Sequence, residues 1–235
     1  MSSARPTVLA IIPAFNEEDN IVSTVEDLRA CAPGVDYIVV DDGSKDSTAA
    51  ICAERSYNYV SLPANLGLAG AFQTGMKYAQ RHGYDYAVQF DADGQHSAAY
   101  IWPMVDHAIA TGSNIVIGSR FCAQKKPVSA RMVGSALISG IIRLTTGQRI
   151  QDPTSGMRLF DKTMIPLFAR CYDFSPEPDT IAHVARSGAK VSEVQVEMRD
   201  RVAGESYLNF TRSMSYMMRV CISILFVQWF RKKAL

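Results

Sequence analysis

Two carboxylates separated by a single residue, Asp91 and Asp93, follow the apolar run from Tyr86 to Phe90. If that run forms a buried strand, both acids lie just beyond the end of the strand. Hard divalent cations take oxygen ligands of this kind and keep coordination positions open for substrate phosphates. The pair therefore indicates a metal ion that binds a diphosphate, and the alternative is an ordinary solvated acidic turn.

A second apolar run ends in two adjacent acids, Asp41 and Asp42. Neighbouring like charges cost free energy unless a partner compensates them, and the base and ribose of a nucleotide would offer hydrogen-bond donors. The alternative is that one of the acids only caps the next helix. Upstream, Pro13 predicts the end of the first strand, and Asn16 predicts the cap of the helix that follows.

Apolar runs of strand length alternate with segments of helical period, which is typical of a mostly parallel sheet flanked by helices. The expected strands are Thr7 to Ile12, Tyr37 to Val40, Tyr57 to Leu62, Tyr84 to Phe90, Asn114 to Gly118 and, later, Lys190 to Met198. The expected helices are Glu17 to Cys31, Ser47 to Arg55, Leu68 to His82, Ala98 to Thr111, Ser129 to Thr146 and Asn209 to Lys233. Ligands of such sheets bind beyond the carboxyl ends of the strands, where both acid pairs fall.

The composition favours a single α/β domain without a nucleic-acid partner. The chain has 235 residues, 48% of them hydrophobic and 20% charged, with a formal net charge of +1. No repeat or linker divides it. Its five cysteines include no C-x-x-C pair, and residues 1 to 5 carry no secretion pattern, so we expect a cytoplasmic protein.

Four segments, in this order and spacing, resemble the family 2 inverting glycosyltransferases with the GT-A fold. They are Val8 to Glu18, Val39 to Ser44, Asn65 to Gly67 and Asp91 to His96. The resemblance is strongest to the branch of dolichyl-phosphate mannose synthases and bacterial polyprenyl-phosphate glycosyltransferases, and it covers Pro6 to Tyr207. It implies one Rossmann-like domain over 1–235, with a nucleotide-sugar-binding half (6–120), an acceptor-binding half (121–208) and a C-terminal amphipathic helix (209–235).

The resemblance also implies a set of site residues. Mg²⁺ or Mn²⁺ would be held by Asp91, Asp93 and Gln95 against the diphosphate of a nucleoside-diphosphate sugar, and the acceptor would attack the anomeric carbon from the opposite face. Asp93 would thereby take part in catalysis. The other residues that would line the donor pocket are Pro13, Ala14, Asn16, Glu17, Asp42, Asn65, Gly67 and Ala92.

Two arginines, Arg120 and Arg131, are expected to bind phosphate oxygens, because guanidinium groups suit them, and Arg120 would act in catalysis. Nearby Lys125 and Lys126 are expected to be surface charges. Asp152 either orders its loop or contacts the acceptor, with neither reading preferred.

A later segment resembles the R-x-x-G-x-S loop that closes over the donor in polyprenyl-phosphate glycosyltransferases. It implies that Arg201 and Ser206 bind the diphosphate and exclude water. Tyr207 replaces the lysine that many relatives have after that serine, which removes one charge that would face a phosphate.

Asp179 occupies the place where relatives that glycosylate a hydroxyl often carry a catalytic base. A lipid phosphate is already an anionic nucleophile at neutral pH and needs no base. The sequence therefore predicts transfer to a membrane-associated acceptor such as polyprenyl phosphate. It leaves two alternatives, transfer to a sugar hydroxyl in cell-surface polysaccharide assembly and a catalytically silent partner subunit.

The segment from Met214 to Phe230 is apolar on nearly every side and is followed by Arg231, Lys232 and Lys233. It is too short to span a bilayer, and an apolar helix beside a basic cluster is typical of docking at an anionic membrane surface. We expect peripheral attachment at the inner face of the plasma membrane. A core helix and a homo-oligomer interface are the alternatives.

Overall fold

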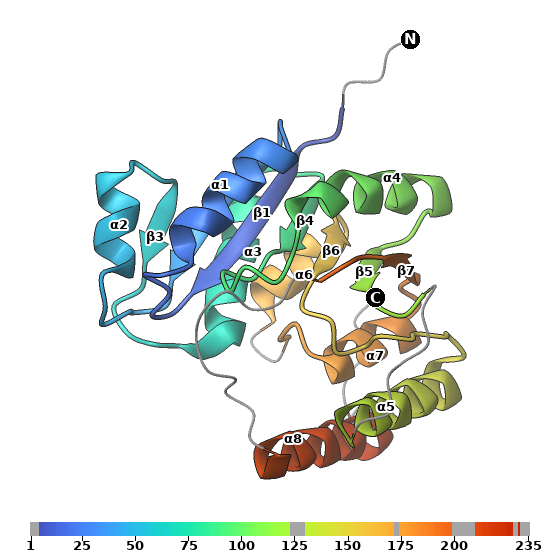
Figure 1. Cartoon of the computed structure of the whole chain (residues 1–235). Coiled ribbons are helices and arrows are strands. Elements are labelled where there is room, and N and C mark those ends of the chain that lie inside the picture. The colour runs from blue at the N-terminus through green and yellow to red at the C-terminus, as the bar shows by residue number, and fades with distance from the viewer. Residues whose placement is uncertain (1–4, 123–129, 172–173, 199–209, 228–229, 231–235) are drawn as a thin grey trace.

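The computed structural model describes residues 5–122, 130–171, 174–198, 210–227 and 230, and it leaves the side chains of residues 130, 131 and 210–214 undescribed. A seven-stranded sheet with the order β3-β2-β1-β4-β6-β5-β7 forms its centre (Figure 1). The strands are β1 (Val8–Ala14), β2 (Asp36–Asp41), β3 (Tyr59–Ser61), β4 (Tyr86–Gln89), β5 (Ile115–Ser119), β6 (Arg158–Asp161) and β7 (Val191–Gln195). Only β6 runs antiparallel to its neighbours, β4 and β5.

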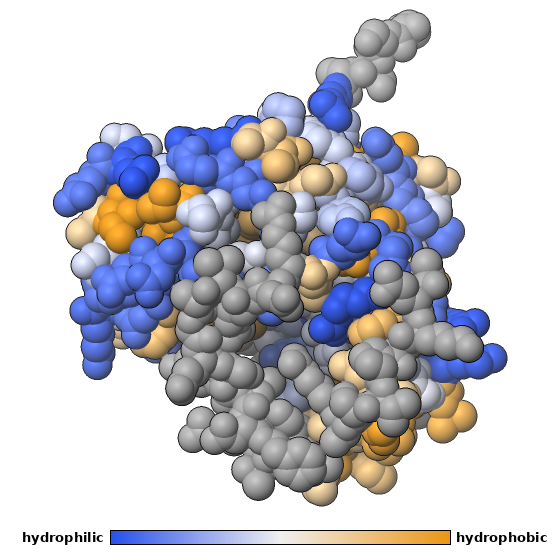
Figure 2. Space-filling model, viewed as in Figure 1, coloured by the Kyte–Doolittle hydropathy of each residue, from blue (hydrophilic) through white to orange (hydrophobic). Residues whose placement is uncertain are grey.

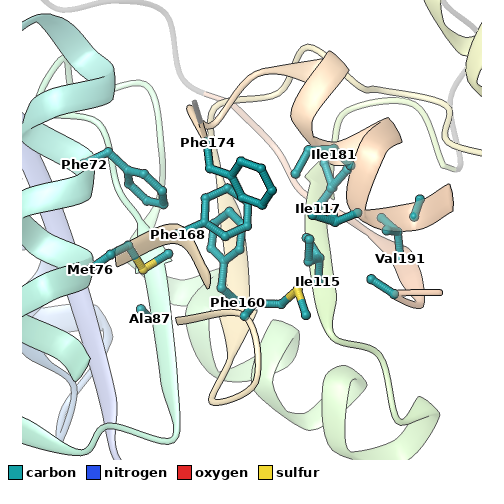
Figure 3. Close-up of a cluster of buried hydrophobic side chains, with 14 of the residues drawn as sticks. Phe72, Met76, Ala87, Ile115, Ile117, Phe160, Phe168, Phe174, Ile181 and Val191 are labelled. Carbon is teal, nitrogen blue, oxygen red and sulfur yellow. The ribbon is translucent and has the colours of Figure 1, made fainter. Parts of the chain in front are cut away.

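Helices cover both faces of the sheet and separate the core into two layers. One face packs against α1 (Ile21–Cys31), α2 (Thr48–Glu54) and α4 (Ile101–Thr111), and a short 3-10 helix, Ala98–Tyr100, precedes α4. The layer on the opposite face contains α3 (Gly67–His82), α5 (Ala130–Thr146), α6 (Ile165–Arg170), α7 (Pro178–Arg186) and α8 (Phe210–Ile222), and α8 packs on α5 and α7. This second layer contains an aromatic cluster, in which Phe160 of β6 contacts Phe72 of α3 and Phe168 of α6 (Figure 3).

The first strand continues through Pro13 to Ala14, so the predicted stop at the proline is wrong. The carbonyl of Ile11 accepts from Phe90 on the β4 side, and the carbonyl of Ala14 accepts from Asp42 on the β2 side. Since successive residues alternate between the two sides, the nitrogen of Pro13 faces β4. That strand ends at Gln89, opposite Ile11, so the missing N–H of Pro13 breaks no ladder bond.

The helix predicted from Glu17 begins instead at Ile21, and Asn16 does not cap it. Asn16 has a left-handed backbone (φ 56°), and its side-chain oxygen accepts from the N–H of Lys45 at 2.8 Å. Its own N–H donates to the hydroxyl of Ser44 at 3.0 Å. Asn16 therefore joins the loop after β1 to the loop after β2.

The C-terminal helix predicted over Asn209 to Lys233 is observed as α8 followed by a π-helical turn, Ser223–Val227. It packs against α5, and a β-carbon added to Gly134 of α5 would collide with the sulfur of Met217. In the described part of the chain, no helix has the length and apolar character required to cross a membrane. Hydrophobic side chains gather around α5 in the lower right of Figure 2.

Candidate active site

A cavity of about 680 Å³ lies at the carboxyl edge of the sheet. Its walls come from the end of β1, the loop after β2, the start of α3 and the loop after β4. Predicted site residues that line it are Pro13, Ala14, Glu17, Asp42, Asn65, Gly67, Asp91, Ala92 and Asp93. Phe15, Leu68 and Ala71 complete the lining. The fold thus brings four segments that are distant in sequence to one cavity.

The two adjacent acids after β2 have different structural roles. Asp42 is 2% exposed, lines the cavity and accepts the N–H of Leu66 at 2.8 Å, so it positions the Asn65 wall. Asp41 turns to its own loop, where it accepts the N–H of Ser44 at 3.0 Å and the hydroxyl of Ser61 at 2.5 Å. These donors compensate two neighbouring charges that would otherwise destabilise the site.

Asp91 and Asp93 both line the cavity, and hydrogen bonds fix each of them. Asp91 accepts from the side-chain amide of Gln89 at 2.8 Å, and its side chain remains 30% exposed. Asp93 accepts the N–H of Gln95 at 3.1 Å. Carboxylates that are oriented in this way and still reach open space suit a divalent cation.

Glycine at position 156 leaves the space that the Asp91 carboxylate fills. A β-carbon at this position would lie 2.3 Å from Asp91 Oδ2 and 3.1 Å from His96 Cε1. Asp91 Oδ2 thus lies close to the backbone at Gly156, and Nδ1 of His96 is 4.0 Å from it. Within the described residues there is no cluster of three or more His, Cys, Asp and Glu side chains that could hold a metal ion. The predicted ligand set contains only two such residues, since its third member is Gln95.

Asn16, Gln95 and Arg120 were predicted for the site but do not line this cavity. Asn16 is bound to the neighbouring loop, as described above, and Gln95 contributes its backbone N–H to Asp93. Arg120 forms two hydrogen bonds of 2.7 Å to Asp152, one from Nε and one from Nη2. Because this arginine is engaged with a carboxylate, phosphate binding by Arg120 stays a prediction.

Asp152 orders its loop, which is one of the two roles considered for it. The side chain is fully buried and also accepts the N–H of Arg120 at 3.1 Å. The N–H groups of Gln151 and Asp152 donate to Glu193 of β7 at 2.6 and 2.7 Å. The loop between α5 and β6 is thus attached to both β5 and β7.

Asp179 lies in a second cavity of about 680 Å³, which shares Leu68 with the first. Its carboxylate accepts from the hydroxyl of Ser223 at 2.6 Å. The same cavity is lined by Glu177, whose carboxylate accepts from the phenol of Tyr216 on α8. Burial and the neighbouring Glu177 charge raise the pKa of Tyr216 far above its ordinary value, so the phenol stays protonated and donates.

The remaining predicted residues lie outside the described part of the structure. Arg201, Ser206 and Tyr207 belong to residues 199–209, and Lys125 and Lys126 belong to residues 123–129. Arg131 is placed in α5, but its side chain is not described. The predicted lid and the phosphate-binding role of Arg131 stay predictions.

Four residues of the site were not assigned a role from the sequence. Gln89 and Gly156 contact Asp91, and His96 accepts the N–H of Asp91 through Nδ1 at 3.3 Å. Arg158 is 2% exposed and starts β6. Gln89 had a usable signal, since it is the only residue between Ala87 and Phe90 with a polar side chain.

Solved structures of other proteins have the same fold. Glucosyl-3-phosphoglycerate synthase from Mycobacterium tuberculosis, crystallised with Mn²⁺, UDP and phosphoglyceric acid, matches 97% of this chain and 80% of its own chain, with a TM-score of 0.65 and 19% sequence identity. The sheet and its helical layers are those of a GT-A glycosyltransferase, which confirms the predicted fold class.

Sequence comparison identifies the family within that class. The model of glycosyl transferase family 2 matches residues 9–166, and the chain belongs to this family. Undecaprenyl-phosphate mannosyltransferase of Micrococcus luteus is 31% identical over 86% of this chain and 87% of its own. Polyprenol monophosphomannose synthase of Mycolicibacterium smegmatis is 28% identical over 93% and 88%. The predicted resemblance and the assignment as a glycosyltransferase are confirmed.

Proposed function

We propose that this glycosyltransferase moves one sugar from a nucleoside diphosphate to polyprenyl phosphate, with a divalent cation and with inversion at the anomeric carbon. The observation that carries the proposal is that Asp91 and Asp93 line one cavity with Asp42 and Asn65. Two relatives are named for transfer to polyprenyl phosphates, and a structural neighbour binds Mn²⁺ and UDP, which supports the same chemistry here. Residues 6–120 would bind the donor and 121–208 the acceptor.

The residues of the cavity fit a cation, because both carboxylates line it and each is oriented by a hydrogen-bond donor. Asp91 and Asp93, with Gln95, would hold Mg²⁺ or Mn²⁺, which neutralises the charge that develops on the departing diphosphate. Asp42 and Asn65 would orient the nucleoside. The acceptor phosphate is anionic at neutral pH, so attack needs no protein base.

The direct test combines purified protein, Mn²⁺, polyprenyl phosphate and a panel of nucleotide sugars, with glycolipid detected by mass spectrometry. We expect one sugar-linked polyprenyl phosphate of inverted anomeric configuration, and none after chelation of the metal. Calorimetry with UDP, GDP and dTDP in the presence of Mn²⁺ tests the alternative of a silent partner subunit. Absence of binding by all three would favour that alternative.

The hydroxyl-acceptor alternative has one supporting observation, because Asp179 lines a cavity that adjoins the donor cavity at Leu68. With a phosphate acceptor, Asp179→Asn is expected to keep transfer within about threefold of the original rate, since no proton must be removed. With a hydroxyl acceptor, the loss would be about 10²-fold or more. Ser223→Ala, which removes the hydrogen-bond donor to Asp179 and keeps the carboxylate, is the control for packing.

We also propose that α8 and the residues that follow it dock the enzyme to an anionic membrane surface, and we place it at the cytoplasmic face. Met218, Ile222, Phe226 and Phe230 are between 49% and 90% exposed. Between positions 208 and 235 the chain has no acidic residue, although it has 23 in total, so the helix would face anionic lipid without repulsion.

Cosedimentation with vesicles tests the docking. Binding to vesicles that contain phosphatidylglycerol is expected to weaken roughly tenfold or more in the double variant Phe226→Ser, Phe230→Ser, because each aromatic side chain buries a large apolar area. Ile109→Ser, which changes a 56% exposed residue of α4 on the other face of the sheet, is the matched control. Equal binding by the double variant would contradict docking through α8, and a dimer in light scattering would support the oligomer alternative.

A further inference from the structure

Gln89 is a buried polar side chain in direct contact with a predicted metal ligand. It ends β4, is 2% exposed, and its amide nitrogen Nε2 donates to Asp91 Oδ1 at 2.8 Å. An ionised carboxylate only accepts hydrogen bonds, so Gln89 must present its NH₂ group to Asp91 and turn its Oε1 away. This bond involves Oδ1 of Asp91, whereas Oδ2 lies next to Gly156.

Arg158 is the neighbour of Gln89 in the sheet. The two residues are register partners in the antiparallel β4–β6 pair, and paired side chains lie on the same face of a sheet within about 5.5 Å at their β-carbons. Ala87 and Phe160, the pair two positions along the ladder, pack in the layer of α3 and α6, so the Gln89–Arg158 pair lies on that same side. Both partners are 2% exposed.

Each partner has one buried polar atom without a hydrogen bond among the described residues, Oε1 of Gln89 and Nε of Arg158. The first is an acceptor and the second is a donor. The other nitrogens of Arg158 are engaged, since Nη1 donates to the carbonyl of Pro176 and Nη2 to the carbonyl of Pro153 at 2.8 Å. A buried unpaired group costs free energy. Because these two complementary groups occupy paired positions but form no direct hydrogen bond, they indicate a contact through one water molecule.

Arg158 is itself fixed by its surroundings. The two carbonyls belong to the loop before β6 and to the loop before α7. Burial lowers the pKa of the guanidinium, and the negative charge of Glu177 opposes that shift. Glu177 in turn accepts from Tyr216 of α8. Because these bonds fix the guanidinium of Arg158, it cannot rotate toward the amide of Gln89. The orientation of the amide is therefore set by Arg158.

We infer that Gln89 is a positioning residue for the metal site, and that Arg158 fixes the orientation of its amide. Arg158 would hold Oε1, the NH₂ group would therefore face Asp91, and this bond would keep the Asp91 carboxylate at the wall of the cavity where the cation would bind. This inference rests on the proposed metal-dependent function and assigns roles to residues outside the predicted ligand set. Outer contacts of this kind typically change metal affinity by 10- to 100-fold.

The test measures Mn²⁺ binding directly, by electron paramagnetic resonance, in the presence of the diphosphate that the original protein binds in the calorimetric panel. Gln89→Met keeps the volume and removes the amide, and it is expected to weaken Mn²⁺ binding about tenfold. Gln73→Met is the matched control, because Gln73 is 8% exposed and donates to the carbonyl of Cys171, away from Asp91. That control is expected to leave Mn²⁺ binding unchanged.

Gln89→Asn guards against a failure to fold, since it keeps an amide that is one methylene too short to reach Asp91. It is expected to weaken Mn²⁺ binding as Gln89→Met does. If a folded Gln89 variant binds Mn²⁺ with the affinity of the original protein, the inference is overturned. If the unmodified protein binds nucleotide without any effect of Mn²⁺, the proposed function fails instead, so the two failures are distinguishable.

A double-mutant cycle tests the role of Arg158. Arg158→Lys keeps the charge and removes Nε, so it should weaken Mn²⁺ binding in the original background and have no further effect in the Gln89→Met background. Additive losses would show that Arg158 acts independently of Gln89 and would overturn that part of the inference.

Discussion

Asp93→Asn is expected to lower sugar transfer by about 10³-fold, the loss that corresponds to several kcal/mol of charge stabilisation by a metal ion. Asparagine keeps the shape and can still accept from the N–H of Gln95, so the loop should retain its conformation. It lacks the charge that attracts a divalent cation. Nucleoside-diphosphate binding should therefore become independent of Mn²⁺, which calorimetry with and without the metal would measure.

Asp106→Asn provides the control for this experiment. Asp106 is an exposed acid of α4, so this substitution removes the same charge at a position away from the cavity. Its transfer rate and Mn²⁺ dependence should match those of the original protein. Asp91→Asn should resemble Asp93→Asn, with an additional conformational effect, since asparagine has only one side-chain oxygen and Oδ1 of Asp91 already accepts from Gln89. An Asp93→Asn variant that still transfers sugar in a Mn²⁺-dependent manner would contradict the assignment of the metal site.

The parts of the fold that depend on local pattern were predictable. β1, β2, β4 and β5 are apolar runs, and the acids that follow them meet at one edge because parallel strands end there. The strand β6 was not predicted. It has four residues and starts with a buried arginine, and its pairing with β4 and β5 is set by contacts that are distant in sequence.

The roles of single polar residues depended on partners that the sequence does not place. Asn16 was expected to cap a helix and instead bonds to Lys45, because a left-handed turn directs its side chain to the loop after β2. Arg120 and Asp152 were considered separately, although they form one bidentate pair across 32 residues of sequence. The residue types in the sequence thus predicted where the cavity lies. Which side chains form hydrogen bonds with each other could be read only from the folded structure.

Removal of Arg120 is expected to destabilise the protein strongly, because it leaves the carboxylate of Asp152 buried without a cation. Breaking a buried ion pair at one partner typically costs about 3–5 kcal/mol. Arg120 is itself 23% exposed, so we expect the lower end of this range for Arg120→Met. Urea denaturation would measure it as a lower midpoint. Arg29→Met, whose pair with Glu26 is about half exposed on both sides, should lose about 1 kcal/mol or less.

A second substitution distinguishes a structural pair from a phosphate ligand at the same position. In the double variant Arg120→Met, Asp152→Asn no buried charge remains, so much of the lost stability should return. If Arg120 also contacts the donor diphosphate, transfer in the stabilised double variant stays low although the protein is folded. If its role is limited to the loop, transfer recovers together with stability. Loss of transfer without any loss of stability in Arg120→Met would contradict the pairing argument, because it would mean that Asp152 does not need its cation.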